Sequence, residues 1–495
     1  MSNYEFTSKF TEGQGGLESA SRILMKGSRI RFADSDDQGV PHTDSDESEL
    51  EKKPDPNLYE LSFIDSLDEY DYIELMITVY ELACEYIDVN ILHMMSPKFN
   101  TDMIESISEL LIAEWVQCGI FDDNESEVEE VYDFVESCIE DYYEFGISKP
   151  RSYKSAQILD APCVSSIGKK IARLQQIEQP EQRSREWYEF RYNLISASSL
   201  SKCLGSESQQ NSLIYEKCKP LEYFGGGATN TSSAMHWGQK FEPVSVMLYS
   251  QMYCTQVSEF GCIQHADYPF IGASPDGINT DPSSERYGRM LEIKNIVNRE
   301  LNGIPKEEYW VQMQIQMETC DLDECDFFET VFKEYSEDEF YADTDHEHRG
   351  VILYFVQRIS VGDINAYASA TNSPKYVYMP LDIPLTKECV DEWIFTKRTE
   401  LRRNWSIYEI QYWYLADYSC VMVPRCKAWF CGALPKIRDI WTIIEKERET
   451  GYEHRASKKR VLKTEVVQGD SSSDSQFIRN MPVVSGICLV KLDHV

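Results

Sequence analysis

Two short segments of the chain, Ser274-Pro275-Asp276-Gly277 and Leu291-Glu292-Ile293-Lys294, combine residue types that can bind a metal ion and activate water. In an extended strand, side chains two positions apart point to the same face, so Glu292 and Lys294 should lie side by side while the intervening aliphatic residues pack in a core. The glycine that follows Asp276 permits a tight turn, so a hairpin can bring Asp276 beside Glu292. Carboxylate oxygens suit Mg²⁺ or Mn²⁺, and such ions turn water into a nucleophile and stabilise charge on a phosphate.

A Glu-x-Lys pattern is weak on its own. At roughly 6% each for Glu and Lys, it arises by chance about once in 250 to 300 positions. The order of the parts is more informative, because a Gly-x-x-x-Glu segment from Gly238 to Glu242 comes before Asp276 and before the strand of Glu292 and Lys294. This order favours a catalytic site over a coincidence of surface charges.

The net charge of -36 over 495 residues is unusual for a protein that binds phosphate groups, which prefer Lys and Arg. The acid is concentrated at the start of the chain, since residues 1–150 hold 36 acidic and 9 basic side chains. The other 345 residues hold 48 acidic and 39 basic side chains, a net charge of only -9. The charge therefore does not exclude a nucleic-acid substrate for the part that carries the motifs.

Composition and apolar spacing divide the chain into six predicted parts. They are a flexible acidic arm (1–55), an acidic helical domain (56–148), a linker with a basic helix (149–182), a mixed α/β core (183–385), a C-terminal helical part of the same domain (386–451) and a loosely ordered tail (452–495). The apolar run 351–356 is typical of a buried strand. The chain is thus expected to be an α/β protein with an added N-terminal helical domain.

The chain has no apolar run near the roughly 18 residues that a membrane span requires, and its N-terminus lacks the apolar core of a signal peptide. We therefore expect an intracellular protein that is not secreted and does not contact a membrane. The 15 cysteines are scattered, which favours reduced thiols over a disulfide scaffold.

Residues 183–330 resemble the phage lambda exonuclease type of the PD-(D/E)xK (RecB-like) nuclease superfamily, in particular its YqaJ-type viral recombinase branch as found in giant viruses. The matching segments are Trp187-Tyr188-Glu189-Phe190-Arg191, Ile195-Ser196-Ala197-Ser198, Trp237-Gly238-Gln239-Lys240-Phe241-Glu242, the two segments above, Ile304-Pro305 and Tyr309-Trp310-Val311-Gln312. They cover roughly the central third of the chain.

The resemblance implies a role for each matched acidic residue and for the lysine. Asp276 and Glu292 would bind the metal ions directly, Glu242 would be a carboxylate near them, and the backbone carbonyl of Ile293 would be a further ligand. Lys294 would orient or deprotonate the attacking water. A site with two Mg²⁺ or Mn²⁺ ions is expected on this basis.

The resemblance also implies that Arg191 and Ser198 hold a DNA phosphate, which suits a guanidinium group and a hydroxyl. Gln312 would contact the lysine, the water or the substrate. The nearby Gln316 and Glu318 are predicted only to solvate the helix that follows the catalytic strand.

The fold implied is a restriction-endonuclease-like core, a central mixed β-sheet flanked by helices. The activity implied is metal-dependent hydrolysis of linear duplex DNA from the 5' end in viral recombination, repair or replication. The implied partners are DNA, further copies of the chain in a ring or dimer, and a single-strand annealing protein. The host cytoplasm or a viral factory is the expected location, with packaging in the virion as an alternative.

Other interpretations remain open from the sequence alone. The core could be an endonuclease or a CRISPR-associated RecB-like nuclease, or a recombination partner that binds DNA without catalysis. Some RecB-like relatives hold an iron-sulfur cluster, which is usually bound through a Cys-x-x-Cys pair. No such pair occurs among Cys420, Cys426 and Cys431, so the sequence favours buried thiols over a cluster. The acidic helical domain could be a solvated surface, a dock for a basic partner, or a cover over the DNA-binding groove.

Overall fold

The computed structural model describes residues 63–64, 66–118, 125–154, 163–178, 180, 184–221, 231, 233–358 and 374–456. The arm predicted over 1–55 and most of the tail predicted over 452–495 lie outside these residues. Among the helices of the described part, none has both the length and the apolar character needed to cross a membrane.

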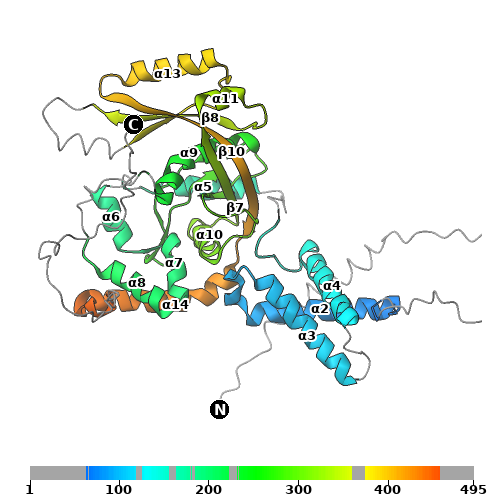
Figure 1. Ribbon diagram of the computed structural model, residues 1–495. Coiled ribbons are helices and arrows are strands. Elements are labelled where there is room, and N and C mark those ends of the chain that lie inside the picture. The colour runs from blue at the N-terminus through cyan, green and yellow to red at the C-terminus, as the bar shows by residue number, and fades with distance from the viewer. Residues whose placement is uncertain are drawn as a thin grey trace, which may run out of the picture. The chain divides into compact units, whose positions relative to one another are not determined.

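The N-terminal part is helical, as predicted. It contains α2 (Glu69–Val89), the 3-10 helix η1 (Ile91–Met95), α3 (Phe99–Cys118) and α4 (Glu125–Glu144), drawn in blue to cyan in Figure 1. Asp68 begins α2 by accepting hydrogen bonds from the backbone N–H groups of Tyr70 and Asp71, both at 2.9 Å. The apolar stripes of the helices face one another and bury residues such as Tyr80 and Phe99.

A seven-stranded mixed sheet lies at the centre of the described chain, in the order β2-β5-β6-β7-β10-β8-β9. In chain order its strands are β2 (Val257–Ser258), β5 (Gly277–Asn279), β6 (Met290–Asn295), β7 (Glu324–Tyr335), β8 (Arg349–Gln357), β9 (Lys375–Tyr378) and β10 (Trp405–Pro424). Strands β6 and β7 run parallel and the other neighbours run antiparallel. Parallel neighbours need a crossover, which is supplied here by α10 (Glu307–Cys320).

A small second sheet has the order β1-β4-β3 and lies beside α10. Its strands are β1 (Ile195–Ser196), β3 (Ile263–Gln264) and β4 (Ile271–Ala273). The other helices are α5 (Val164–Gln175), α6 (Arg185–Tyr192), α7 (Ala197–Leu204), α8 (Glu207–Cys218), α9 (Ala234–Met252), α11 (Glu337–Ala342), α13 (Lys387–Leu401), α14 (Lys427–Thr450) and the 3-10 helix η2 (Glu453–Arg455).

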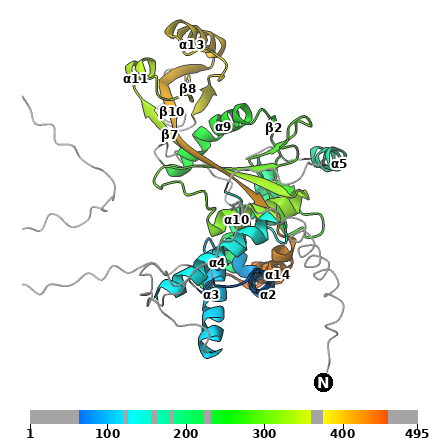
Figure 2. The same ribbon diagram turned by 90° about the vertical axis from the view of Figure 1, so that its right-hand side faces the viewer.

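Helices α9 and α10 cover opposite faces of the central sheet (Figures 1 and 2). On the α9 face, Leu291 and Ile293 of β6 pack with Tyr249 and Phe328. The α10 face is the side on which β6 presents Glu292 and Lys294. The predicted fold class, a central mixed sheet flanked by helices with an N-terminal helical part, is confirmed.

The prediction of a helical part from 386 to 451 is wrong over residues 405–424, which form the long strand β10 between α13 and α14. This strand pairs with β8 through its first half and with β7 through its second half. Bulges between Ile407 and Glu409 and between Leu415 and Asp417 each shift the register. Each bulge reverses the alternation of inward and outward side chains, which removes the two-residue period that identifies a strand.

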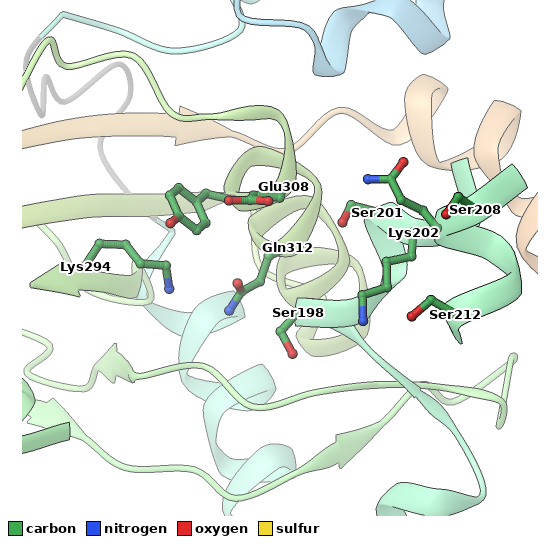
Figure 3. Close-up of a pocket in the computed structure, with 10 residues that line it drawn as sticks. Ser198, Ser201, Lys202, Ser208, Ser212, Lys294, Glu308 and Gln312 are labelled. Atoms are coloured by element: carbon green, nitrogen blue, oxygen red, sulfur yellow. The ribbon is translucent and has the colours of Figure 1, made fainter. Parts of the chain in front are cut away.

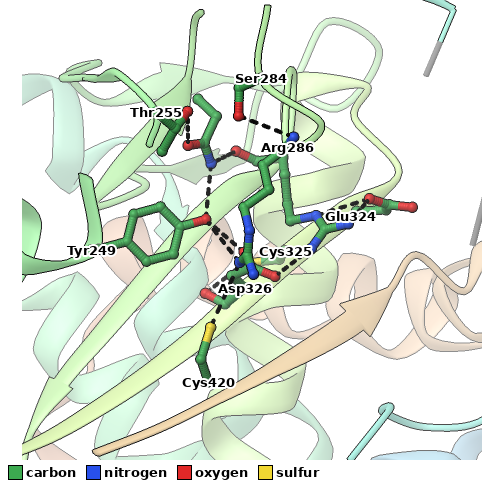
Figure 4. A network of polar contacts seen from close by, with 10 residues as sticks. Tyr249, Thr255, Ser284, Arg286, Glu324, Cys325, Asp326 and Cys420 are labelled. Atoms are coloured by element: carbon green, nitrogen blue, oxygen red, sulfur yellow. Dashed lines mark hydrogen bonds and ion pairs between the residues drawn. The ribbon is translucent and has the colours of Figure 1, made fainter. Parts of the chain in front are cut away.

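A buried polar network lies behind β6, on the α9 face (Figure 4). Asp326 of β7 is fully buried and forms ion pairs with Arg286 and with Arg289, the latter at 3.1 Å. The Asp326 oxygen that pairs with Arg286, Oδ2, also accepts a hydrogen bond from the Tyr249 hydroxyl at 2.5 Å. Asn279 of β5 donates to the Tyr249 hydroxyl at 3.1 Å. The network therefore joins α9, β5, the β5–β6 connection and β7.

We predict that Asp326→Asn lowers the free energy of unfolding by about 3–5 kcal/mol, because it removes the charged partner of the largely buried Arg286 and leaves buried Arg289 with Glu324 alone. Equilibrium urea unfolding followed by circular dichroism measures this loss. Asp417→Asn, at an exposed position of β10, is the control and should change stability by about 0.5 kcal/mol or less. A loss below about 1 kcal/mol for Asp326→Asn would show that the network is not a structural support.

Candidate active site

The hairpin of β5 and β6 brings Asp276 to the strand of Glu292 and Lys294. Gly277 pairs with Leu291 across the hairpin, and the Asp276 carboxylate accepts a hydrogen bond from the backbone N–H of Ile293 at 2.7 Å. Gly277 is favoured here because a Cβ at this position would lie 2.2 Å from Cγ1 of Val257. The predicted convergence of Asp276 with β6 is therefore present, and the close approach of the Val257 side chain explains the glycine.

Glu292 and Lys294 point to the same face of β6, as the two-residue period predicted. They form an ion pair in which the Glu292 side chain is fully buried and the Lys294 side chain is 24% exposed. The Lys294 ammonium also lies 5.0 Å from the ring centre of Tyr309 on α10. Its partly exposed position allows Lys294 to contact a substrate, whereas Glu292 is fixed inside the protein.

The two carboxylates place excess negative charge in a buried position. Burial raises the pKa of Asp276 well above its usual range, and the charges of Glu292 and of Glu242 on α9 raise that pKa further, against the opposing effect of Lys294. Burial alone would lower the pKa of Lys294, but the charges of Glu292 and Asp276 outweigh it and raise that pKa. A cation between the carboxylates would relieve the repulsion that these shifts report.

The donor set fits a magnesium or manganese ion. Asp276 and Glu292 offer hard oxygen ligands beside Lys294, and Mg²⁺ binds through one or two carboxylates while water and phosphate oxygens complete its shell. Within the described residues, no group of three or more His, Cys, Asp and Glu side chains is clustered to hold a metal. The expected participation of exposed Glu242 and of the Ile293 carbonyl stays a prediction.

Gln316 lies beside Glu292 in the site, whereas the sequence predicts that it is a solvated residue on the surface of the helix. Its side chain is fully buried and its amide donates hydrogen bonds to Glu292 at 2.7 Å and to the backbone carbonyl of Ser274 at 3.4 Å. The amide therefore fixes the carboxylate and links both segments of the motif. A signal was present, because Gln316 lies four residues after Gln312 and so falls on the same helical face.

Arg191 lies at the end of α6 and reaches the loop that carries Asp276. Its guanidinium donates a hydrogen bond to the Ser274 hydroxyl at 3.3 Å and lies 4.7 Å from the ring centre of Trp187. The Lys217 ammonium donates to the Arg191 carbonyl at 2.8 Å, and Arg448 of α14 donates to the next carbonyl, that of Tyr192, at 2.7 Å. Helices α8 and α14 thus hold the backbone from which Arg191 extends.

A cavity of about 520 Å³ extends from Lys294 to α7 and α8 (Figure 3). Its lining residues are Ser198, Ser201, Lys202, Ser208, Gln209, Ser212, Lys294, Glu308, Tyr309 and Gln312. Hydroxyl, amide and ammonium groups dominate this surface, and all of them can donate hydrogen bonds to phosphate oxygens. The structure therefore places Ser198 and Gln312 in one cavity with Lys294, while Arg191 approaches through Ser274.

The three C-terminal cysteines lie in different settings. Cys420 is on β10 beside the Arg286 guanidinium at 3.8 Å, and burial raises its thiol pKa to about 12. Cys426 immediately precedes α14, and Cys431 is exposed within that helix.

The fold and the site together define a carboxylate–lysine site of the PD-(D/E)xK type, in which a hairpin on a mixed sheet presents Asp, Glu and Lys. Comparison with known families agrees, since residues 186–323 match the YqaJ-like viral recombinase domain. The resemblance predicted from the motifs is thus confirmed for this segment.

One viral protein and two solved structures are also similar to parts of the chain. Over 302 residues the chain is 28% identical to uncharacterized protein R354 of Acanthamoeba polyphaga mimivirus, which covers 55% of this chain and 54% of the relative. The chain therefore spans about half the length of that relative. An alkaline exonuclease from Laribacter hongkongensis aligns with a TM-score of 0.31 at 16% identity, over 54% of this chain and 95% of its own. A phage-related exonuclease from Haemophilus somnus aligns with a TM-score of 0.27 at 15% identity, over 53% and 96%.

We predict that Gln316→Leu weakens Mn²⁺ binding about 10- to 100-fold, because Glu292, an expected ligand, loses the hydrogen-bond donor that orients it. Titration of Mn²⁺ followed by electron paramagnetic resonance measures the affinity. Gln314→Leu is the control. The Gln314 side chain donates a hydrogen bond to the Pro424 carbonyl and accepts one from the Cys426 N–H, and both partners belong to the chain segment before α14. Gln314→Leu should lower stability and leave the Mn²⁺ affinity within about twofold; an equal loss in both variants would refute the assignment of Gln316.

Proposed function

We propose that this protein is a metal-dependent exonuclease that hydrolyses linear duplex DNA from the 5' end. The observation that carries the proposal is the constellation of Asp276, Glu292 and Lys294 on one hairpin, inside the segment that matches the viral recombinase domain. The chemistry of these groups suits a phosphodiester, whose anionic oxygens repel hydroxide unless positive charge is supplied.

Each residue has a separate task in the proposed reaction. Asp276 and Glu292 would hold Mg²⁺ or Mn²⁺, which when bound lowers the pKa of water and stabilises the leaving oxygen. The Lys294 ammonium would supply a fixed positive charge at the attacked phosphoryl group and orient the water. Gln312, in the same cavity, would donate a hydrogen bond to that water or to a phosphate oxygen.

The terminal phosphate would be held by Arg191 and Ser198. Arg191 is fixed through its backbone by Lys217, and its guanidinium already approaches Ser274, two residues before Asp276. A phosphate bound there would lie next to the metal ligands, so the adjacent phosphodiester could be positioned for attack. This arrangement would favour DNA ends that carry a 5'-phosphate.

We also propose that the protein acts inside the infected cell, in recombination, repair or replication of viral DNA. A homo-oligomer that encloses DNA, and a single-strand annealing protein that covers the complementary strand, would suit this role. The family match of residues 186–323 supports these proposals.

An endonuclease would use the same chemistry on a different substrate. A covalently closed duplex circle and its linear form distinguish the two activities. Hydrolysis of the linear form alone supports the exonuclease, whereas equal rates on both substrates would favour the endonuclease.

We predict that Asp276→Asn and Lys294→Met each reduce Mg²⁺-dependent hydrolysis of linear duplex by about 1,000-fold or more, because each removes charge stabilisation at the phosphoryl group. Release of labelled nucleotides measures the rate, and circular dichroism verifies the fold. Lys333→Met, at an exposed position of β7, should retain the wild-type rate. Unchanged hydrolysis by either site variant would refute the proposed site.

We predict that Arg191→Met slows hydrolysis of 5'-phosphorylated ends about 100-fold and removes the preference for these ends over 5'-hydroxyl ends. The two substrates are compared at equal concentration for each variant. Arg185→Met alters an exposed residue of the same helix and should preserve the preference. If wild-type protein cleaves both ends equally fast, the phosphate pocket is wrongly assigned.

A further inference from the structure

A second cavity, of about 660 Å³, is lined by aromatic side chains and lies outside the site described above. Trp237 comes from α9, Tyr354 from β8, Tyr376 from β9 and Tyr408 from β10. The ring centre of Tyr354 lies 5.3 Å from that of Tyr376 and 4.9 Å from that of Tyr408. The three tyrosines therefore form a row across three adjacent strands.

Tyr408 owes its position to a bulge. The pairing of β10 with β8 shifts between Ile407 and Glu409, so Tyr408 has no partner in the ladder. Such a bulge redirects the side chain of the extra residue. The Tyr408 side chain is 64% exposed, whereas Tyr354, which it contacts, is buried at 7%. The Tyr408 ring is therefore supported by Tyr354 on one side and faces solvent elsewhere, where a flat ligand can stack on it.

Polar groups surround the aromatic row, and hydrogen bonds within the protein hold them in place. His236 accepts from or donates to the Tyr376 hydroxyl at 2.7 Å, which fixes that ring. The Gln411 amide donates to Glu409 at 2.9 Å, and both residues line the cavity with Asn298. Amide and carboxylate groups of this kind can pair with the edge of a nucleobase whose ring is stacked on an aromatic side chain.

The charge inside the cavity argues against a cationic ligand. The Lys240 ammonium is 4.5 Å from the ring centre of Trp237 and forms an ion pair with Glu334 at 2.5 Å. One aromatic face and one carboxylate are thus already occupied by a cation. A lysine or arginine of a partner protein would meet Lys240, whereas a neutral base would not.

The cavity lies close to the proposed catalytic residues. Val297 and Asn298 line it and follow Lys294 by three and four residues, so Val297 lies at most about 11 Å along the chain from Lys294. This reach equals about three nucleotide steps of 3.4 Å. On α9, Lys240 lines the cavity two residues before Glu242.

We propose that this cavity binds an unpaired nucleobase of the DNA near the cleavage site, stacked on the exposed ring of Tyr408. The proposal rests on the proposed function for its substrate class and adds a second contact to it. The site of hydrolysis would hold the phosphates, and the aromatic cavity would hold a base that has separated from its partner. Stacking needs no particular sequence, because each base has a flat face.

The test measures binding without hydrolysis. A fluorescein-labelled single strand of 12 nucleotides and the matching blunt duplex are titrated with the full chain in EDTA, and anisotropy gives the affinities. Tyr408→Ala should weaken single-strand binding about tenfold and duplex binding less than twofold, and Tyr408→Trp should restore the single-strand affinity. Tyr418→Ala, at a 46% exposed tyrosine of the same strand, is the control and should bind like the wild type.

Equal single-strand affinity of Tyr408→Ala and wild type would overturn the proposal, as would an equal loss for duplex. Binding of a lysine- and arginine-rich peptide that depends on Tyr408, without a matching effect on the oligonucleotide, would also overturn it. The binding titration in EDTA does not depend on hydrolysis. If the proposed function fails, the wild-type protein will not hydrolyse DNA when Mg²⁺ is added, but its single-strand binding will still depend on Tyr408.

Discussion

The hydrogen bond from the backbone N–H of Ile293 to the Asp276 carboxylate is the contact on which the site depends. It fixes a carboxylate from the connection before β5 against the backbone of β6, and thereby places two acidic side chains together where burial opposes their charge. The arrangement is tolerable only if the hairpin is held firmly and if positive charge is close. Lys294 provides part of this charge within the protein, and a bound cation would provide the rest.

Each face of β6 contributes in a different way. On the α9 face, Asp326 with Arg286 and Arg289 forms a buried support that joins the β5–β6 connection to β7. On the α10 face, Gln316 fixes Glu292 and Gln312 opens toward the cavity. A strand that is rigid on one face and chemically active on the other can hold a ligand geometry without sacrificing its packing.

Local patterns predicted much of strand β6. The alternation of Leu291, Glu292, Ile293 and Lys294 predicted which side chains pack in the core and which lie together on the other face. The convergence of Asp276 with this strand was predicted too, although Gly277 lies within β5 and not in a turn.

The fold beyond this hairpin was harder to predict, because tertiary contacts decide it. Bulges in β10 disrupt the two-residue period, so a strand of 20 residues was interpreted as helix. Gln316 was interpreted as a surface residue because a polar side chain on a helix is usually solvated, whereas α10 packs between the sheet and α7 and buries it. The burial of Gln316 and the path of β10 both depend on elements that are distant in the sequence, so a local pattern does not reveal them.

We propose that Asp276 and Glu292 form a cation site that the hairpin assembles before substrate binds. Electron paramagnetic resonance of Mn²⁺ titrated into the free protein, with and without Asp276→Asn, measures this binding. We expect the wild type to bind Mn²⁺ and Asp276→Asn to weaken the binding at least about tenfold while the fold is retained. Equal Mn²⁺ affinity in the two proteins, or no binding by the wild type, would contradict it.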